Sequence, residues 1–196
     1  MRIAIDIQGM QTESRFRGIG RYIGSLLDAF AAINTDHEVF LLVNANFPES
    51  VMELRSRYSQ PRSNFQVLQW HAFDQATCES VHSDAESAVS RSLFLSFVNN
   101  LNPDVFLCSS IFEGYLNAAN TAIPKKEHRS YIYVAIVYDL IPFRMADIYL
   151  QDENYAAFYQ KKLAEIENVD ICLTISEFSK TDIEESKLIG GGTAVN

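Results

Sequence analysis

Two glycines stand where a polar stretch gives way to an apolar helical stripe, in the segment Gly18-Ile19-Gly20-Arg21-Tyr22. Glycine at the start of a helix lets a ligand approach the first N–H groups closely, and the helix dipole favours negative charge there. The segment is therefore a candidate anion site. The same glycines also suit a tight turn from loop to helix without any ligand, and the residues alone favour neither interpretation.

A carboxylate, Asp139, follows the apolar run Tyr131–Tyr138 and precedes Leu140-Ile141-Pro142. Open α/β sheets place ligands and catalytic groups at the carboxyl ends of their strands, so Asp139 could bind a sugar hydroxyl or orient a reacting group. An aspartate ahead of an apolar residue and proline also caps the following turn. Taken alone, the pattern favours the capping role.

A third polar cluster, Ser176-Glu177-Phe178-Ser179-Lys180, directly follows the apolar run Asp170–Ile175. Ser176 is suited to cap a helix expected over Glu177–Ser186, because serine oxygens accept hydrogen bonds from the first N–H groups of a helix. Capping explains this spacing without a ligand, so the cluster gains a functional interpretation only in combination with other motifs.

Metal, redox and hydrolase chemistry find no support in the remaining residues. The scattered histidines form no Ser-His-Asp arrangement and no spacing typical of metal ligands, so we expect neither a metal site nor a bound cofactor. The apolar run Glu38–Asn44 ends in an amide where an NAD site would place an acid, which disfavours an NAD(P)-dependent enzyme. The histidines are His37, His71, His82 and His128.

Short apolar runs alternate with helical stripes from one end of the chain to the other. The runs contain few polar residues, as expected of strands that helices cover on both faces. The pattern predicts a Rossmann-like, doubly wound α/β fold with a mostly parallel sheet, as one domain over residues 1–186. We expect residues 187–196 to be a flexible tail or the start of an interdomain linker. The expected strands are Ile3–Ile7, Glu38–Asn44, Phe65–Trp70, Val105–Cys108, Tyr131–Tyr138 and Asp170–Ile175.

Composition and charge exclude several classes of partner. The net charge is −9 and the lysines and arginines do not cluster beyond pairs, which argues against a nucleic-acid-binding surface. The same scarcity of clustered cations leaves at most a weak peripheral association with anionic membranes. Three cysteines, Cys78, Cys108 and Cys172, show no pairing pattern and indicate free thiols. We therefore expect a cytoplasmic protein, at most loosely attached to the inner face of the membrane.

Together and in this order, the three motifs resemble family 4 glycosyltransferases, the large retaining family of the GT-B fold. In that family a first strand ending in aspartate, here Asp6, leads to a loop that closes on the pattern found at Arg17–Tyr22. Two later strands end in patterns found here at Tyr138–Pro142 and Thr174–Ile183. The similarity spans the chain from its first expected strand to its last expected helix.

The resemblance implies two facing Rossmann-like domains with the active site between them, of which this chain is the N-terminal, acceptor-side half. The C-terminal, donor-binding domain would be absent. By position, Asp139 and Tyr138 would be catalytic and face the transferred sugar, with tyrosine where other members have histidine. Gly18, Ile19 and Gly20 would bind the donor diphosphate. The cleft or sugar-binding residues would be Tyr22, Ser176, Glu177 and Lys180.

The implied reaction is the retaining transfer of a hexose, mannose or rhamnose, from a GDP- or dTDP-linked sugar. The acceptor would be a glycan or a lipid-linked sugar in surface polysaccharide synthesis, and this chain alone would be inactive. Acceptor choice is expected in the loops 8–17, 109–122 and 144–154. The alternative is a stand-alone, non-catalytic Rossmann-like binding module, which would lack the second α/β domain.

Overall fold

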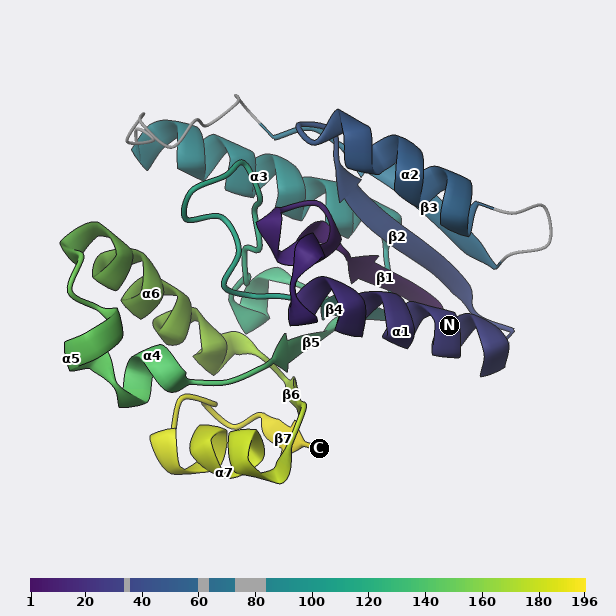
Figure 1. The fold of residues 1–196 in the computed structure, drawn as a ribbon. Helices are drawn as coiled ribbons and strands as arrows, with labels where there is room; N and C mark the ends of the chain where they lie inside the picture. The colour runs from purple at the N-terminus through teal and green to yellow at the C-terminus, as the bar shows by residue number, and fades with distance from the viewer. Residues whose placement is uncertain (34–35, 60–63, 73–83) are drawn as a thin grey trace.

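The structure is a computed structural model that describes residues 1–33, 36–59, 64–72 and 84–196. Seven strands form one sheet in the order β3-β2-β1-β4-β5-β6-β7, and all pairings among the described residues are parallel (Figure 1). The prediction of a Rossmann-like α/β fold is confirmed. The strands are β1 (Arg2–Asp6), β2 (Glu38–Asn44), β3 (Phe65–Trp70), β4 (Val105–Cys108), β5 (Ile132–Val137), β6 (Ile171–Thr174) and β7 (Thr193–Val195).

Helices α1 (Gly18–Ile33) and α2 (Pro48–Tyr58) cover one face of the sheet over β1, β2 and β3. Apolar residues recur along α1 at helical spacing, so Ile23 points to the sheet and is fully buried. It belongs to one core with Ile5 of β1 and Leu41 of β2, which lie opposite each other in the strand register. This half of the domain therefore has a closed hydrophobic layer.

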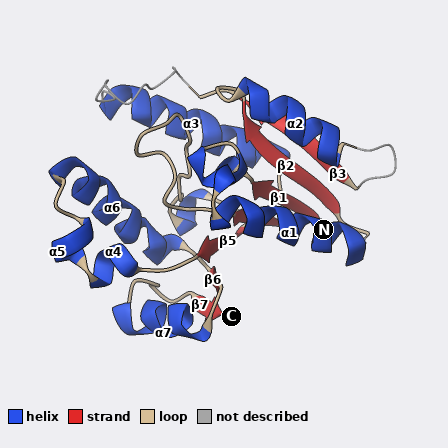
Figure 2. Cartoon of the chain, in the orientation of Figure 1, coloured by secondary structure: helices blue, strands red, loops and turns tan. Residues whose placement is uncertain are grey.

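Three longer helices, α3, α6 and α7, contribute to the core on the opposite face (Figure 2). Successive residues of a strand point to opposite faces, so this core receives the alternate residues of the same strands. Aromatic rings dominate its centre. The Phe106 ring of β4 lies 6.0 Å from that of Phe94 in α3 and 5.0 Å from that of Tyr133 in β5. The helices are α3 (Asp84–Leu101), α6 (Glu153–Glu165) and α7 (Glu177–Ser186).

The two halves of the sheet differ in how the face under α1 and α2 is covered. Leu41 in β2 is fully buried, whereas Ile132 in β5 is 48% exposed and Val195 in β7 is 44% exposed. Ile171 and Leu173 of β6 lie on the same face and are half-buried. We call this surface of β5, β6 and β7 the open face. None of its four residues belongs to either buried core of the described residues.

Short helices replace two expected loops. The polar segment after β1 forms two 3-10 helices, η1 (Gln8–Met10) and η2 (Glu13–Phe16). Two single-turn helices, α4 (Ile141–Arg144) and α5 (Ala146–Tyr149), follow β5. Elements of three or four residues are too short to show a helical period, so the sequence pattern missed them. Two more 3-10 helices are η3 (Lys126–His128) and η4 (Ile166–Asn168).

Within residues 187–196, predicted to be a flexible tail or the start of an interdomain linker, Thr193–Val195 forms β7 and pairs with β6. Ala194 packs into the buried core on the α7 side. Gly191 has a φ of +103°, which glycine adopts without strain, so the glycine-rich stretch makes a turn into the sheet. A strand of three residues beside glycines offers no pattern that a sequence analysis can detect.

Two of the three predicted free thiols, Cys108 and Cys172, are confirmed as free and are buried. Cys78 and His82 lie outside the described residues. Among the helices that the structure describes, none is both long and apolar enough to cross a bilayer.

Candidate functional site

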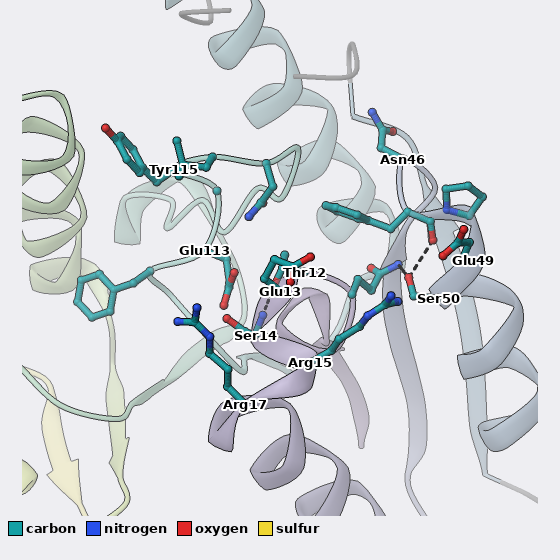
Figure 3. Close-up of a pocket in the computed structure, with 17 residues that line it drawn as sticks. Thr12, Glu13, Ser14, Arg15, Arg17, Asn46, Glu49, Ser50, Glu113 and Tyr115 are labelled. Atoms are coloured by element: carbon teal, nitrogen blue, oxygen red, sulfur yellow. Dashed lines mark hydrogen bonds between the residues drawn. The ribbon is translucent and has the colours of Figure 1, made fainter. Parts of the chain in front are cut away.

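A cleft of about 730 Å³ lies at the carboxyl edge of the sheet, beyond the ends of β1, β2 and β4. The loops that follow these strands line it with residues 11–15, 17, 46–50 and 112–117 (Figure 3). The strand order reverses between β1 and β4, and open parallel sheets bind ligands at such a reversal. We call this cavity the main cleft.

The side chain of Gln8, fully buried beneath the main cleft, holds three segments together. Its Nε2 donates to Asp6 Oδ1 at 2.9 Å and to the Asn120 carbonyl at 2.8 Å. Its Oε1 accepts from Asn44 Nδ2 at 3.1 Å and from the Asn120 N–H at 3.0 Å. The amide thus uses both donors and both lone pairs, and it fixes the 109–122 loop to the ends of β1 and β2.

Asn44, at the end of β2, serves the same framework. Its N–H donates to Gln11 Oε1 at 2.7 Å, and its carbonyl accepts from Gln11 Nε2 at 3.0 Å. Its own Nδ2 donates to the Ala118 carbonyl at 2.8 Å. The amide at this position therefore joins two loops, which explains in structural terms why no acidic residue stands here.

Charged side chains of α3 and α6 hold the same, C-terminal end of the 109–122 loop. The buried ammonium of Lys162 donates to the Thr121 carbonyl at 3.0 Å and to Thr121 Oγ1 at 2.8 Å. Burial lowers the pKa of Lys162, although Glu165 opposes that shift. Arg91 donates to the Ile123 carbonyl at 2.7 Å and pairs with Glu165. The C-terminal end of the loop is therefore held by both the sheet side and the helix side.

Burial raises the pKa of Asp6 to about 7, against the opposing hydrogen bonds from Gln8. The negative charge of Glu113 raises it further, and Lys162 lowers it. Desolvation disfavours the charged carboxylate, so Asp6 is a largely protonated group at mildly acidic pH. Asp6 braces the loop that follows β1, because its carboxyl group accepts the hydrogen bond from Gln8.

Hydroxyls and charges of both signs line the main cleft. Figure 3 shows Arg17 and Glu113 pointing toward one another. Glu113 Oε1 also accepts a hydrogen bond from Ser110 Oγ at 3.2 Å, and Glu113 is only 8% exposed. No group of three or more His, Cys, Asp or Glu comes together among the described residues. Further polar lining residues are Thr12, Glu13, Ser14, Arg15 and Glu49.

The structure brings several of the predicted site residues together at the ends of β5 and β6. The rings of Tyr22 and Tyr138 meet edge to face with centroids 5.6 Å apart. The Tyr138 hydroxyl donates to the Ser109 carbonyl at 3.1 Å, and the Tyr138 carbonyl accepts from Ser179 Oγ at 2.8 Å. Ser176 caps α7 by accepting from the Ser179 N–H at 3.1 Å. These residues form a continuous contact chain from α1 to α7.

Other predicted residues have structural contacts. Asp139 is exposed, and its carboxylate accepts from the Ile141 N–H at 3.0 Å, which is the capping role that the sequence favours. Glu177 Oε1 accepts from Asn196 Nδ2 at 2.9 Å. Lys180 lies half-buried in α7. Their predicted roles in catalysis and sugar binding stay predictions.

The two predicted diphosphate glycines differ. A Cβ at Gly20 would lie 2.5 Å from Arg15 Cα and 2.6 Å from its carbonyl oxygen, so glycine is required for η2 to pack on α1. A Cβ at Gly18 would meet nothing within 4 Å. Gly20 therefore has a sufficient structural reason, while Gly18 and the half-buried Ile19 stand at the start of the helix with open space beside Gly18.

Two features of the site escaped the sequence analysis. The segment 46–50 forms one wall of the main cleft, and its proline, Pro48, marks only the start of α2. Ser109 is fully buried, and its hydroxyl has no hydrogen-bond partner in the described part of the chain. The 144–154 loop, expected to help choose the acceptor, does not line the main cleft, but Asp152 accepts from the Tyr115 hydroxyl at its rim.

No family model matches the chain, but curated proteins and solved structures are similar to it. The serotype-specific mannosyltransferase WbdA of Escherichia coli is 27% identical over 197 residues, which is 100% of this chain and 23% of that protein. A second WbdA of Escherichia coli is 24% identical over 82% of this chain and 20% of its own length. The chain thus spans about a fifth of the curated relatives it matches.

Two solved structures share the fold at low identity. Sucrose-phosphate synthase from Thermosynechococcus elongatus has a TM-score of 0.57 at 13% identity, covering 100% of this chain and 47% of that chain. UGT89C1 of Arabidopsis thaliana, complexed with UDP-L-rhamnose, has a TM-score of 0.54 at 14% identity, covering 98% and 50%. The chain shares the fold of about half of each of these GT-B structures. The fold implied by the sequence motifs is confirmed.

Proposed function

We propose that the full-length protein is a retaining mannosyltransferase and that this chain is its acceptor-binding domain. Relatives named as mannosyltransferases support mannose as the transferred sugar. Structural neighbours complexed with UDP-L-rhamnose or UDP support a nucleotide-sugar donor, which we take to be GDP-linked. The main cleft carries the proposal, because its position at the strand reversal and its mixed polar lining suit a sugar.

In this proposal a second domain binds the donor and closes over the carboxyl edge of the sheet. The chain spans about half of its GT-B structural neighbours, which leaves room for such a domain. Gly18 and Ile19 would then approach the donor diphosphate, while Tyr138, Tyr22 and Asp139 would face the transferred sugar. The contact chain from α1 to α7 supports this grouping of the two tyrosines.

The chemistry needs no dedicated base on this chain. Breaking the sugar–phosphate bond leaves negative charge on the diphosphate, which helix dipoles and basic side chains can stabilise. The departing phosphate oxygen can accept the proton of the acceptor hydroxyl, which gives retention without a separate base. The acceptor would be a glycan or a lipid-linked sugar in surface polysaccharide synthesis. The free thiols at Cys108 and Cys172 support a cytoplasmic location.

Transfer of mannose from GDP-mannose tests the proposal, measured with the full-length protein and with residues 1–196 alone. We expect turnover only with the full-length protein, and calorimetric binding of a mannoside, but not of GDP-mannose, to the chain alone. In the full-length protein, Arg17→Ala should raise the KM for the acceptor several-fold, because Arg17 lines the main cleft. Arg55→Ala, an exposed arginine of α2 outside the main cleft, is the matched control. Turnover by residues 1–196 alone would refute the division of roles.

A further inference from the structure

A second cavity, of about 520 Å³, adjoins the main cleft. Helices α3 and α6 and the 113–122 loop line it. Glu113, Gly114 and Tyr115 line both cavities, so a single strip of the chain separates them. We call this strip the ridge and the second cavity the side cleft.

The ridge is a rigid wall. Gly114 has a φ of +102°, and a Cβ there would lie 2.4 Å from the Ala119 carbonyl oxygen, so the loop folds tightly back on itself. The Tyr115 hydroxyl donates to Asp152 Oδ1 at 2.9 Å, which fixes the ridge to the start of α6. Lys162 fixes the loop again at Thr121. A ligand that reaches from one cleft to the other must therefore cross this wall.

Apart from the exposed ammonium of Lys161, the lining of the side cleft suits an uncharged, hydroxyl-rich ligand. Phe158 is half-buried there, and its ring centroid lies 5.5 Å from that of Tyr115. Arg91, Lys162 and Glu165 also line the side cleft, but they bond to one another and to loop oxygens. Their charges are largely compensated within the protein. Aromatic surface with satisfied polar groups around it is the kind of pocket that packs against the apolar faces of sugar rings.

We propose that the acceptor is an oligosaccharide that lies across the ridge. Its accepting sugar occupies the main cleft, and the sugars preceding it occupy the side cleft against Phe158 and Tyr115. This inference rests on the proposed function and adds the length of the acceptor. Two adjoining sites on one rigid support bind an oligosaccharide more tightly than either site alone. Once one part of the ligand is bound, its other part meets the second site at a high effective concentration.

Calorimetric titration of residues 1–196 with mannobiose and mannotetraose tests the inference. We expect mannotetraose to bind at least about tenfold more tightly than mannobiose, because only the longer ligand reaches the side cleft. Phe158→Ala should reduce the affinity for mannotetraose to that for mannobiose and leave mannobiose binding unchanged. Phe158 lines the side cleft and not the main cleft. Phe178→Ala, which removes a 72% exposed ring of α7 outside both clefts, is the matched control and should change neither affinity.

A second variant keeps the inference testable if Phe158→Ala does not fold. Lys161 lines the side cleft, is exposed and forms no hydrogen bond or ion pair with the described residues, so Lys161→Ala leaves the fold intact. We expect a loss of about threefold for mannotetraose alone, the scale of one weak solvated contact. Equal binding of the two sugars, or a length preference that neither variant reduces, overturns the two-cleft acceptor while the proposed function stands. Failure of both sugars to bind refutes the proposed function and this inference with it.

Discussion

The two ends of the sheet are built from similar strands but are covered differently. Over β1, β2 and β3, helices α1 and α2 close one face, and Ile5 and Leu41 are at most 2% exposed. On the same face of β5, β6 and β7, Ile132 and Val195 at the edges are nearly half exposed, although Val134 and Ile136 of β5 are buried. Parallel sheets are normally buried on both faces. At the covered end, the main cleft therefore lies next to a core that helices close on this face. At the open end, apolar side chains of the strands remain in contact with solvent.

The largest expected effect on stability comes from truncating an aliphatic side chain to alanine, and it should differ between the covered end and the open end. Leu41→Ala should lower the free energy of unfolding by about 2 to 5 kcal/mol, because it leaves a cavity in a closed core. Ile132→Ala should cost about 1 kcal/mol or less, because half of its surface is already in water. Chemical denaturation of both variants measures the difference. Equal losses would mean that the open face is as tightly packed as the closed one.

Two carboxylates at the two ends should respond to pH in opposite directions. Burial raises the pKa of Asp6 to about 7, so the folded protein holds a proton that the unfolded chain releases near pH 4. Between about pH 4 and 7 the folded state binds more protons, and stability therefore falls as the pH rises, by up to about 4 kcal/mol. Denaturation at several pH values measures this slope, and Asp6→Asn should flatten it.

At the open end, burial opposes ionisation of Asp170, but hydrogen bonds from Arg129 and the Tyr133 N–H prevail and lower its pKa. Its contribution to stability is therefore present above about pH 4 and lost only as the pH falls further. The slope between pH 4 and 7 should not depend on Asp170. Asp147→Asn, at an exposed position of α5, is the control and should leave the slope as it is. An unchanged slope in Asp6→Asn would mean that Asp6 is not its source.

A smaller effect concerns the glycines at the start of α1, the helix that closes the covered end. Gly20→Ala should destabilise the fold by about 1 to 3 kcal/mol, because its Cβ would collide with the Arg15 backbone. Gly18→Ala should cost nothing and add up to about 0.5 kcal/mol, because open space surrounds it and alanine favours the helix. Thermal melts of the two variants provide the comparison. A loss with Gly18→Ala as large as with Gly20→Ala would contradict the packing argument.

The smallest effect is expected at Ser109, where the strand order reverses between the two ends. Its buried hydroxyl has no partner in the described part of the chain, so Ser109→Ala should leave stability unchanged or raise it by up to about 1 kcal/mol. Ser50→Ala is the matched control. Its hydroxyl donates to the Phe47 carbonyl at 2.8 Å and accepts from Gln11, so its removal should cost about 1 to 2 kcal/mol. Denaturant midpoints would contradict this if Ser109→Ala were the costlier change.

The sequence predicted the strands and helices whose apolar pattern extends over several residues. Six strands and the long helices were visible because buried runs such as Glu38–Asn44 and stripes such as that of α1 extend over several residues. The short β7 strand and the 3-10 helices after β1 were missed, because elements of this length depend on tertiary contacts. The open face could not be predicted either, because the apolar pattern of a strand is the same whether or not a helix covers that face.

For the site, the sequence could locate loops but not their contacts. Of the three loops expected to choose the acceptor, 8–17 and 109–122 line the main cleft and 144–154 does not. Asn44 ended a strand and Gln8 stood in an unpatterned stretch, so neither revealed that they hydrogen-bond to each other across 36 residues. The role of residues 46–50 as a wall of the main cleft was missed for a similar reason. Their position depends on which strands are neighbours in the sheet. Pairing between distant segments is a property of the fold, and one sequence does not display it.

The buried Gln8 amide has a consequence for redesign. It binds the ends of three segments, at Asp6, Asn44 and Asn120. Exposed lining residues such as Glu13 can therefore change while these contacts stay in place. Libraries that vary Glu13 and Ser14 and keep Gln8, Asn44 and Asn120 would explore new sugar preferences, because they also spare the structural contacts of Thr12, Arg15 and Tyr115. Libraries that vary Gln8, Asn44 or Asn120 would leave buried amide groups without partners, which costs stability.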